Sequence, residues 1–367
     1  MAQIPQRVSL VAQTKTVLIQ GIADGRWRHR LPGERSLCAE LQVSRGTLRS
    51  ALSILTAQKL VRSRHGQPCQ IVSGGKIRAS KGNPSRVACL TPEAPSRMPP
   101  FYLVWIDSLR ARLQRLGIQL DLYHGARYYR RDGARKLRAL VEQNPHSAWI
   151  LTLSTSAMQQ WFQARGLPAI VAGSLHPGIS LPSVDNNFRA IGRHAGGLVF
   201  ARGHRRVAFL ASSLGYGGIG PGTVEIERGV REAFGATRER ECELTAIYHE
   251  PNRDDICRAL DRLLAAPAPP TAVIIAHSTS LLTSLTHLAR KKVSIPEDLS
   301  LVVTHDEPFF AHIVPDLSHY EWSPEKFAAQ YTRLVGLALE DMLQPDTCIR
   351  LMPRFVAGQT LRPPRGP

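Results

Sequence analysis

Apolar residues between positions 31 and 66 recur at the spacing of two short helices, which pack through Leu37, Leu41, Val43, Leu48, Leu52 and Leu55. This spacing lets each helix bury one side against the other. Two strand segments follow, residues 60–64 and 69–72, around a turn at His65 and Gly66, where glycine permits a positive φ. The order of helix, turn, helix and hairpin predicts a winged helix-turn-helix.

The exposed side of the second predicted helix carries side chains suited to a DNA groove. Ser44 can cap this helix through its hydroxyl, with the first backbone amides free to bind a phosphate. Arg45 and Arg49 stand four residues apart on one face, where a guanidinium can bind the O6 and N7 edge of guanine. Thr47 can contact a phosphate or a thymine methyl group. We therefore expect this helix to enter the major groove.

Beyond residue 85, apolar strand segments alternate with amphipathic helical segments. The predicted strands are residues 87–90, 118–123, 148–153, 169–172, 207–211, 245–248, 272–276 and 299–304, and the predicted helices are residues 102–116, 133–142, 188–202, 223–234, 256–264 and 281–290. This alternation predicts parallel sheets flanked by helices, with right-handed crossovers. Residues 73–85 are rich in Gly, Ser and Lys and are predicted to be a flexible linker. The predicted domains are residues 1–72 and 86–362.

The charge distribution favours a polyanionic partner at the front of the chain. The formal net charge is +18, and residues 1–85 hold 14 Lys and Arg against 3 Asp and Glu. No stretch approaches the ~20 apolar residues of a membrane-spanning helix, and the first ten residues lack the apolar segment of a signal peptide. We expect a cytoplasmic protein. The six cysteines show no spacing typical of a zinc site or a disulfide framework, so no metal is predicted.

Residues 8–72 resemble the GntR-type winged helix. The resemblance lies in residues 31–35, Leu-Pro-Gly-Glu-Arg, and residues 43–49, Val-Ser-Arg-Gly-Thr-Leu-Arg. It implies operator contacts at Arg35, Ser44, Arg45, Thr47, Arg49, His65 and Gly66. Gly46 departs from the family, which usually has threonine or a bulkier polar residue here, and it lowers helix propensity. Taken singly, each arginine could also be a solvated surface charge.

Residues 86–362 resemble the effector domain of LacI-type regulators, which has the fold of periplasmic sugar-binding proteins. The resemblance lies in residues 184–187, 203–210, 271–276 and 295–303. It implies an α+β winged helix-turn-helix followed by a two-lobed α/β periplasmic-binding-protein-like domain, with a small ligand between the lobes. One lobe is expected to comprise residues 86–185 and 320–343. The hinge helix usual in LacI-type regulators is missing, and the linker takes its place.

Several positions depart from sugar-binding members of that family. His277 and Ser278 replace Asn-Asp, Ile226 replaces an arginine, and residues 304–306 read Thr-His-Asp where Phe-Asp-Asp is usual. These changes remove two charged anchors for hydroxyl groups, so a standard sugar pose is not predicted. The candidate ligand residues are Phe101, Tyr216, Tyr248, Ser278, His305 and Asp306. For each of them, core packing or a loop position is the alternative interpretation.

No motif predicts catalysis or a cofactor. The glycine-rich residues 215–222 lack the Lys and the Ser or Thr of a nucleotide-binding P-loop, and no nucleophile elbow or zinc-protease motif occurs. We therefore expect a ligand-responsive transcriptional regulator that represses genes by binding a palindromic operator as a homodimer, with a small carbohydrate-like effector. One alternative is a regulator whose C-terminal domain has lost its ligand and only dimerises. Another is a free binding protein with no operator.

Overall fold

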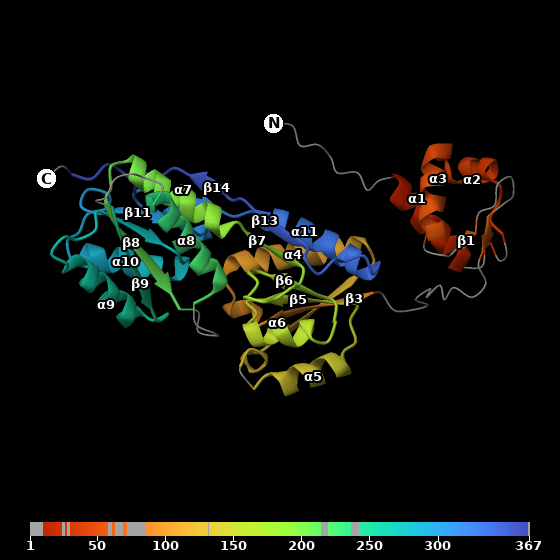
Figure 1. Cartoon of the computed structure of the whole chain (residues 1–367), viewed down its shortest axis with the longest axis horizontal. Coiled ribbons are helices and arrows are strands. Elements are labelled where there is room, and N and C mark those ends of the chain that lie inside the picture. Colours follow the sequence, from red (N-terminus) through yellow and green to blue (C-terminus); the bar gives the residue numbers. More distant parts are fainter. Residues whose placement is uncertain are drawn as a thin grey trace. The chain divides into compact units, whose positions relative to one another are not determined.

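The computed structural model divides the chain into two compact units, residues 1–83 and residues 84–367 (Figure 1). It describes residues 10–23, 26–27, 30–57, 61–62, 69–71, 85–130, 132–213, 219–235 and 242–365. The predicted linker, residues 73–85, lies outside these ranges except for its last residue. Within these ranges, no helix is long and apolar enough to cross a membrane.

The described residues of the N-terminal unit form three helices and a short hairpin. Its elements are α1 (Leu10–Ala23), α2 (Glu34–Leu41), α3 (Arg45–Ala57), β1 (Val61–Arg62) and β2 (Gln70–Ile71), with the two strands antiparallel. Helix α2 ends where Gln42 adopts a left-handed conformation, with φ of 51°. The core contains Leu18, Trp27, Leu31, Leu37, Leu48, Ala51, Leu52, Leu55 and Val61. The apolar spacing thus predicted the packing of α2 on α3.

The C-terminal unit contains two six-stranded sheets. The sheet of lobe I has the order β13-β7-β6-β5-β3-β4, and that of lobe II the order β14-β12-β11-β10-β8-β9. Lobe I comprises β3 (Arg86–Thr91), β4 (Gln119–His124), β5 (Ala148–Thr152), β6 (Ala169–Ala172), β7 (Ser183–Asn186) and β13 (Cys348–Leu351), all parallel. Lobe II comprises β8 (Arg206–Ser212), β9 (Glu243–His249), β10 (Ala272–Ile275), β11 (Ser300–Val303), β12 (Ser318–Glu321) and β14 (Arg354–Val356). Only β14 is antiparallel to its neighbour.

Helices cover both faces of each sheet (Figure 1). In lobe I, α4 (Pro100–Arg115) and α11 (Pro324–Leu339) cover one face, and α5 (Ala134–Gln143) and α6 (Ser156–Gln163) cover the other. In lobe II, α7 (Phe188–Ala201) and α8 (Pro221–Gly235) cover one face, and α9 (Arg253–Leu264) and α10 (Ser278–Arg290) cover the other. Three short 3-10 segments are η1 (Pro95–Arg97), η2 (Ala126–Tyr128) and η3 (Pro308–His312). Each lobe therefore has two apolar cores, one on either side of its sheet.

The expected division between the lobes was wrong at the C-terminal end of the chain. Tyr320 lies in β12, is fully buried in the core of lobe II, and bonds to His194 of α7 at 2.8 Å. Lobe I contains α11, as expected, and it also contains β13, which lies beyond the predicted limit at residue 343. The chain crosses between the lobes after β7, after β12 and between β13 and β14. Along β12, the buried Ser318 and Tyr320 alternate with the half-buried His319 and Glu321, and Tyr320 packs into the core of lobe II.

Glycines set how closely α7 and α8 pack in lobe II. A Cβ atom added at Gly192 would overlap the carbonyl oxygen of Ile226, and one added at Gly229 would overlap that of Arg189. The two backbones are therefore in direct contact, which only glycine allows. This contact holds the first turn of α8 beside Phe188, the first residue of α7.

Candidate DNA-binding helix and effector cavity

The first turn of α3 is organised by Ser44. Its hydroxyl oxygen accepts a hydrogen bond from the backbone N–H of Thr47 at 3.1 Å and lies 2.8 Å from the Thr47 hydroxyl. This is the geometry of a helix N-cap. Behind it, Leu48 and Leu52 are buried against α1 and α2, so the polar side of the helix faces outward.

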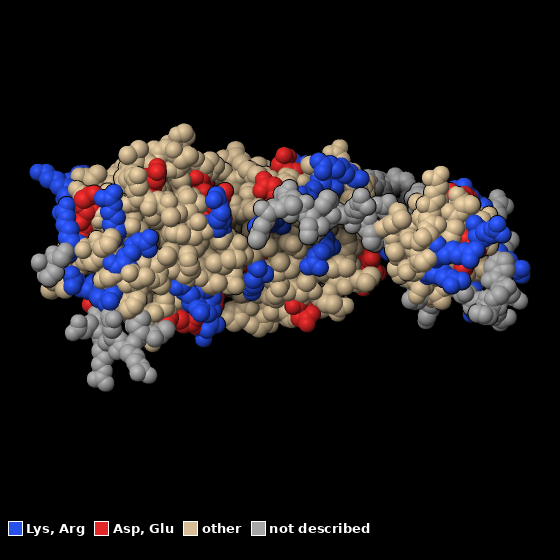
Figure 2. Space-filling model, turned by 90° about the horizontal axis from the view of Figure 1, so that it is seen from above, with Lys and Arg blue, Asp and Glu red and all other residues tan. Residues whose placement is uncertain are grey.

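Three arginines lie exposed around this turn. The Nε atom of Arg49 lies 3.0 Å from a carboxylate oxygen of Glu34, the first residue of α2. Arg35 and Arg45 are exposed, and neither forms an ion pair with any residue in the described part of the chain. Figure 2 shows the Lys and Arg side chains on the N-terminal unit, at the right of that view. His65 and Gly66, predicted at the wing tip, lie outside the described residues.

A cavity of about 980 Å³ lies between the two lobes of the C-terminal unit. Its walls are formed where parallel strands end and the following helices begin, the usual place for ligands in open α/β sheets. Lobe I contributes Phe101 of α4 and Asp185 of β7, and lobe II contributes Phe188 of α7 and Ser278 of α10. The segment between β12 and α11, which crosses from one lobe to the other, contributes Trp322.

Aromatic rings gather around Trp322. Its ring lies 5.0 Å from that of Phe101, 5.8 Å from that of Phe188 and 4.4 Å from that of His305, measured between centroids. The indole N–H donates to the carbonyl of Thr304 at 3.2 Å, which fixes the orientation of the ring. The cluster thus joins aromatic residues of both lobes, with their rings tilted or edge-to-face, into an apolar wall that can contact a ring-shaped ligand.

Two histidines line the cavity, and their hydrogen bonds define their tautomers. Nδ1 of His277 accepts from the backbone N–H of Ser212 at 3.2 Å, so its Nε2–H donates to the Thr223 hydroxyl at 3.1 Å. The Thr304 hydroxyl donates to the Ala276 carbonyl at 3.1 Å, so it accepts from Nδ1 of His305 at 3.3 Å. Burial lowers the pKa of His277 to about 4, and burial also lowers the pKa of His305. Both rings are neutral, and His305 keeps Nε2 as an acceptor.

Three carboxyl groups line the same cavity. Asp185 accepts hydrogen bonds from the Ser174 hydroxyl and from the backbone N–H of Asn186, and burial raises its pKa to about 6. Glu307 accepts from the Ser278 hydroxyl at 2.9 Å, and burial raises its pKa. Burial also raises the pKa of Asp306. Among the described lining residues, the only Lys or Arg is the exposed Arg130.

The structure places the predicted ligand residues in two groups. Phe101, Ser278, His305 and Asp306 line the cavity. Tyr248 is not among its lining residues, because its hydroxyl donates to Glu227 and its ring packs 6.4 Å from that of Phe209 in the core of lobe II. Tyr216 lies outside the described residues.

Sequence reasoning missed Trp322, Asp185, Phe188 and Glu307 as lining residues. Glu307 comes shortly after the predicted strand at residues 299–304, so its position after a strand was the available signal, whereas β12, which precedes Trp322, was not predicted. His277 was noted only as a departure from the family pattern. Within the described residues, no group of His, Cys, Asp and Glu side chains has the arrangement of a metal site.

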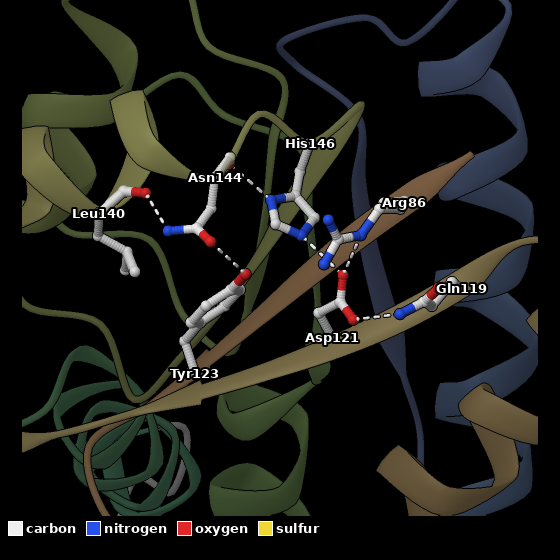
Figure 3. A network of polar contacts seen from close by, with 7 residues as sticks. All are labelled: Arg86, Gln119, Asp121, Tyr123, Leu140, Asn144 and His146. Atoms are coloured by element: carbon white, nitrogen blue, oxygen red, sulfur yellow. Dashed lines mark hydrogen bonds and ion pairs between the residues drawn. The ribbon is translucent and has the colours of Figure 1, made fainter. Parts of the chain in front are cut away.

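A separate polar network lies in lobe I where the second unit begins (Figure 3). Asp121 accepts from Arg86 at 2.7 Å, from Gln119 at 2.7 Å and from Nε2 of His146 at 2.9 Å. Burial acts to raise the pKa of Asp121, but these hydrogen bonds outweigh it and hold the pKa below its usual value. Nδ1 of His146 faces the Asn144 carbonyl at 2.7 Å, so both ring nitrogens face acceptors. The network ties the beginning of β3 to β4 and to the loop before β5 and does not line the cavity.

Comparison with protein families assigns both parts of the chain. Residues 10–71 match the family of bacterial regulatory proteins, gntR family, and residues 197–361 match the periplasmic binding protein-like domain. These matches confirm the resemblance predicted from the sequence and the predicted fold class, an N-terminal helix-turn-helix domain followed by a two-lobed α/β domain.

Individual relatives cover different parts of the chain. The probable HTH-type transcriptional repressor ExuR of Bacillus subtilis (strain 168) is 32% identical over 71 residues, which make up 19% of this chain and 21% of that protein. The chain thus matches about a fifth of the length of this curated relative.

Solved structures resemble a larger share of the chain. The transcriptional regulator CelR in complex with cellobiose has a TM-score of 0.64 at 19% identity, over 90% of this chain and all of that one. A regulatory protein of the LacI family from Chloroflexus aggregans has a TM-score of 0.64 at 17% identity, over 75% of this chain and 98% of that one. At these identities the likeness concerns the fold.

Proposed function

We propose that this chain, which joins a gntR-family segment to a periplasmic-binding-protein-like domain, is a transcriptional regulator that responds to a small molecule. It binds a palindromic operator as a homodimer through α3 and represses transcription. A small ring-shaped, carbohydrate-like effector binds in the cavity between the lobes and changes the affinity for the operator.

The DNA-binding part of this proposal rests on the polar side of α3. Ser44 caps the helix, and Arg45 and Arg49 lie exposed on it while its apolar side is buried. A helix presented in this way fits the major groove, where arginine can read guanine. Arg35, Thr47, His65 and Gly66 complete the proposed contact surface. The surplus of positive charge in residues 1–85 favours DNA over a neutral partner.

The cavity supports the effector half of the proposal. Its volume of about 980 Å³ falls at the upper end of the usual range for small-molecule sites, and both lobes line it. A ligand that touches both lobes stabilises the state in which the lobes are closed around it. The free energy of coupling to DNA binding is then set by how much more tightly the ligand binds this closed state than the open one. Phe101, Ser278, His305 and Asp306 are the proposed contacts retained from the sequence. One relative with the same fold is the CelR regulator, solved with cellobiose.

Selection of DNA fragments by the purified protein tests this function. We expect enrichment of a sequence with two-fold symmetry, bound with an affinity that falls steeply as salt rises. If the selected fragments share no sequence, the regulator assignment is wrong. If an operator emerges but no metabolite from an induced lysate alters its binding, the C-terminal domain serves only assembly.

A further inference from the structure

The cavity between the lobes differs in charge from the rest of the protein. The chain holds 47 Lys and Arg against 29 Asp and Glu, yet the described lining carries three carboxyl groups and one exposed arginine. Asp185 and Glu307 are at least nine-tenths buried, at 5% and 9% exposure. Among the described lining residues, a ligand with a carboxylate or phosphate would find one cation, Arg130, to pair with it and would face three acidic groups.

The helix N-termini at the cavity do not make it favourable for an anionic ligand. A helix N-terminus attracts anions because its first backbone N–H groups point outward. Helices α4 and α8 begin with Pro100 and Pro221, which have no N–H. The hydroxyl of Thr155 already accepts the N–H of Met158 in α6. At α4, α6 and α8 the amides that would bind an anion are therefore partly absent or already bonded. The N-cap of α10, His277, makes no side-chain hydrogen bond to its amides, but this helix begins at Ser278, whose hydroxyl donates to the carboxylate of Glu307.

The polar side chains that face the cavity instead offer acceptors. Glu307 receives one hydrogen bond from a side chain, that of Ser278, on its Oε1 atom. His305 is neutral with Nε2 as an acceptor, because its Nδ1 donates to Thr304. The His305 ring also lies 4.4 Å from the ring of Trp322, so acceptors and an aromatic face occur side by side. Aromatic faces and carboxylates together favour a positively charged group.

We propose that the effector is a cationic ring compound, an amine-bearing sugar or aromatic ring, whose ring lies against Trp322 and whose ammonium group pairs with the carboxylates of Asp306 and Glu307. This inference rests on the proposed function and narrows its effector from a carbohydrate-like compound to an amine. The same groups exclude the corresponding acid, because the buried carboxylate of Glu307 and the half-buried carboxylate of Asp306 would be left facing a third negative charge.

Matched trios of ligands test the proposal with the full-length protein. Each trio carries an amine, a hydroxyl or a carboxylate on one ring: glucosamine, glucose and glucuronate, then tryptamine, tryptophol and indole-3-acetate. Affinity is measured by calorimetry at pH 7.5. We expect an amine to bind at least about tenfold more tightly than its neutral partner, and the acid not to bind. A neutral or acidic member that binds as well as its amine, or no binding by either amine at 10 mM, overturns the proposal.

Charge-removing variants locate the ammonium group. Glu307→Gln and Asp306→Asn should each weaken the amine about tenfold or more and leave the neutral partner within about twofold. Glu142→Gln, which removes an exposed carboxylate of α5 outside the cavity, is the matched control and should change neither affinity. If a variant loses equal affinity for the amine and for the neutral ligand, the carboxylates do not bind the ammonium group. Loss of operator selection would contradict the proposed function and leave these ligand results standing.

Discussion

Arg49 of α3 lies with its Nε atom 3.0 Å from the carboxylate of Glu34 at the beginning of α2. Both side chains are exposed, at 69% for Arg49 and 41% for Glu34, and an exposed pair contributes at most about 1 kcal/mol. The pair therefore holds the guanidinium on the outer face of α3, but it is weak enough for another anion to replace Glu34. We infer that DNA displaces Glu34 from Arg49 when the helix binds.

This relationship predicts the effect of Glu34→Gln. The variant should change the free energy of unfolding by less than about 1 kcal/mol, because the ion pair is exposed. It should also bind both operator and unrelated DNA more tightly, because a negative charge near the phosphates is removed. Affinities measured across a salt series check this. Weaker operator binding by the variant would show that Glu34 positions Arg49 for the groove.

Arg45→Ala tests base recognition by α3. Arg45 is exposed at the first turn with no ion pair among the described residues. Its loss should cost roughly 1–3 kcal/mol on the operator and relax the preference at one base pair in each half-site. We propose that the exposed Arg62 of β1 contacts phosphates. The matched control Arg62→Ala should then weaken the binding of all DNA alike. An unchanged base preference for Arg45→Ala in a selection assay would refute its role.

Gly46→Ala tests the cost of the unusual residue in the recognition helix. A Cβ atom at this position would meet only the Ser44 hydroxyl oxygen, at 3.8 Å, so it fits without a clash. Alanine restores helix propensity, and we expect the N-terminal unit to gain about 0.5–1 kcal/mol of stability. Thermal unfolding of the full chain measures this. A lower unfolding temperature would mean that α3 needs the freedom of glycine at its beginning.

Sequence patterns predicted most elements that bury a continuous apolar side, although the helices α6 and α11 were not among the predicted ones. All eight predicted strands and all six named helices of the C-terminal unit occur close to their expected positions. The missed strands β7, β12, β13 and β14 have at most four residues each, and they alternate or contain polar residues. Their pairing depends on neighbours distant in sequence, which a local pattern does not contain.

The cavity was harder to predict than the fold because its residues come from strand ends, helix beginnings and loops that are distant in the sequence. Ser278, His305 and Asp306 follow predicted strands, so their position could be inferred from the rule that ligands bind at the carboxyl ends of parallel strands. Tyr248 also ends a strand, but β9 is the edge strand, and its hydroxyl bonds to Glu227 of α8. Trp322 required knowledge of the crossover between the lobes, which the sequence did not reveal.

His277 should make the C-terminal unit sensitive to acid. Its pKa is lowered from 6.5 to about 4, so the folded state resists protonation more than the unfolded state does. The associated stability is fully present above pH 6.5 and is lost as pH falls toward 4, by up to roughly 3 kcal/mol. His277→Gln should lose less stability than the wild type between pH 7 and pH 4.5, measured by denaturant unfolding. The control His124→Gln removes an exposed histidine and should follow the wild type.

Asp185 should affect stability in the opposite direction over a similar range of pH. Its pKa is raised from 3.8 to about 6 because burial penalises the carboxylate more than the bonds from Ser174 and Asn186 favour it. The folded state then holds its proton longer than the unfolded state, so this group costs stability as pH rises from about 4 to 6, by at most roughly 3 kcal/mol. Asp185→Asn keeps an acceptor for the Ser174 hydroxyl and should be more stable than the wild type above pH 6, with the difference vanishing near pH 4. The exposed carboxylate of Asp346 provides the control Asp346→Asn, which should show no such crossover. If Asp185→Asn is instead less stable at every pH, the carboxylate contributes more through its hydrogen bonds than its burial costs.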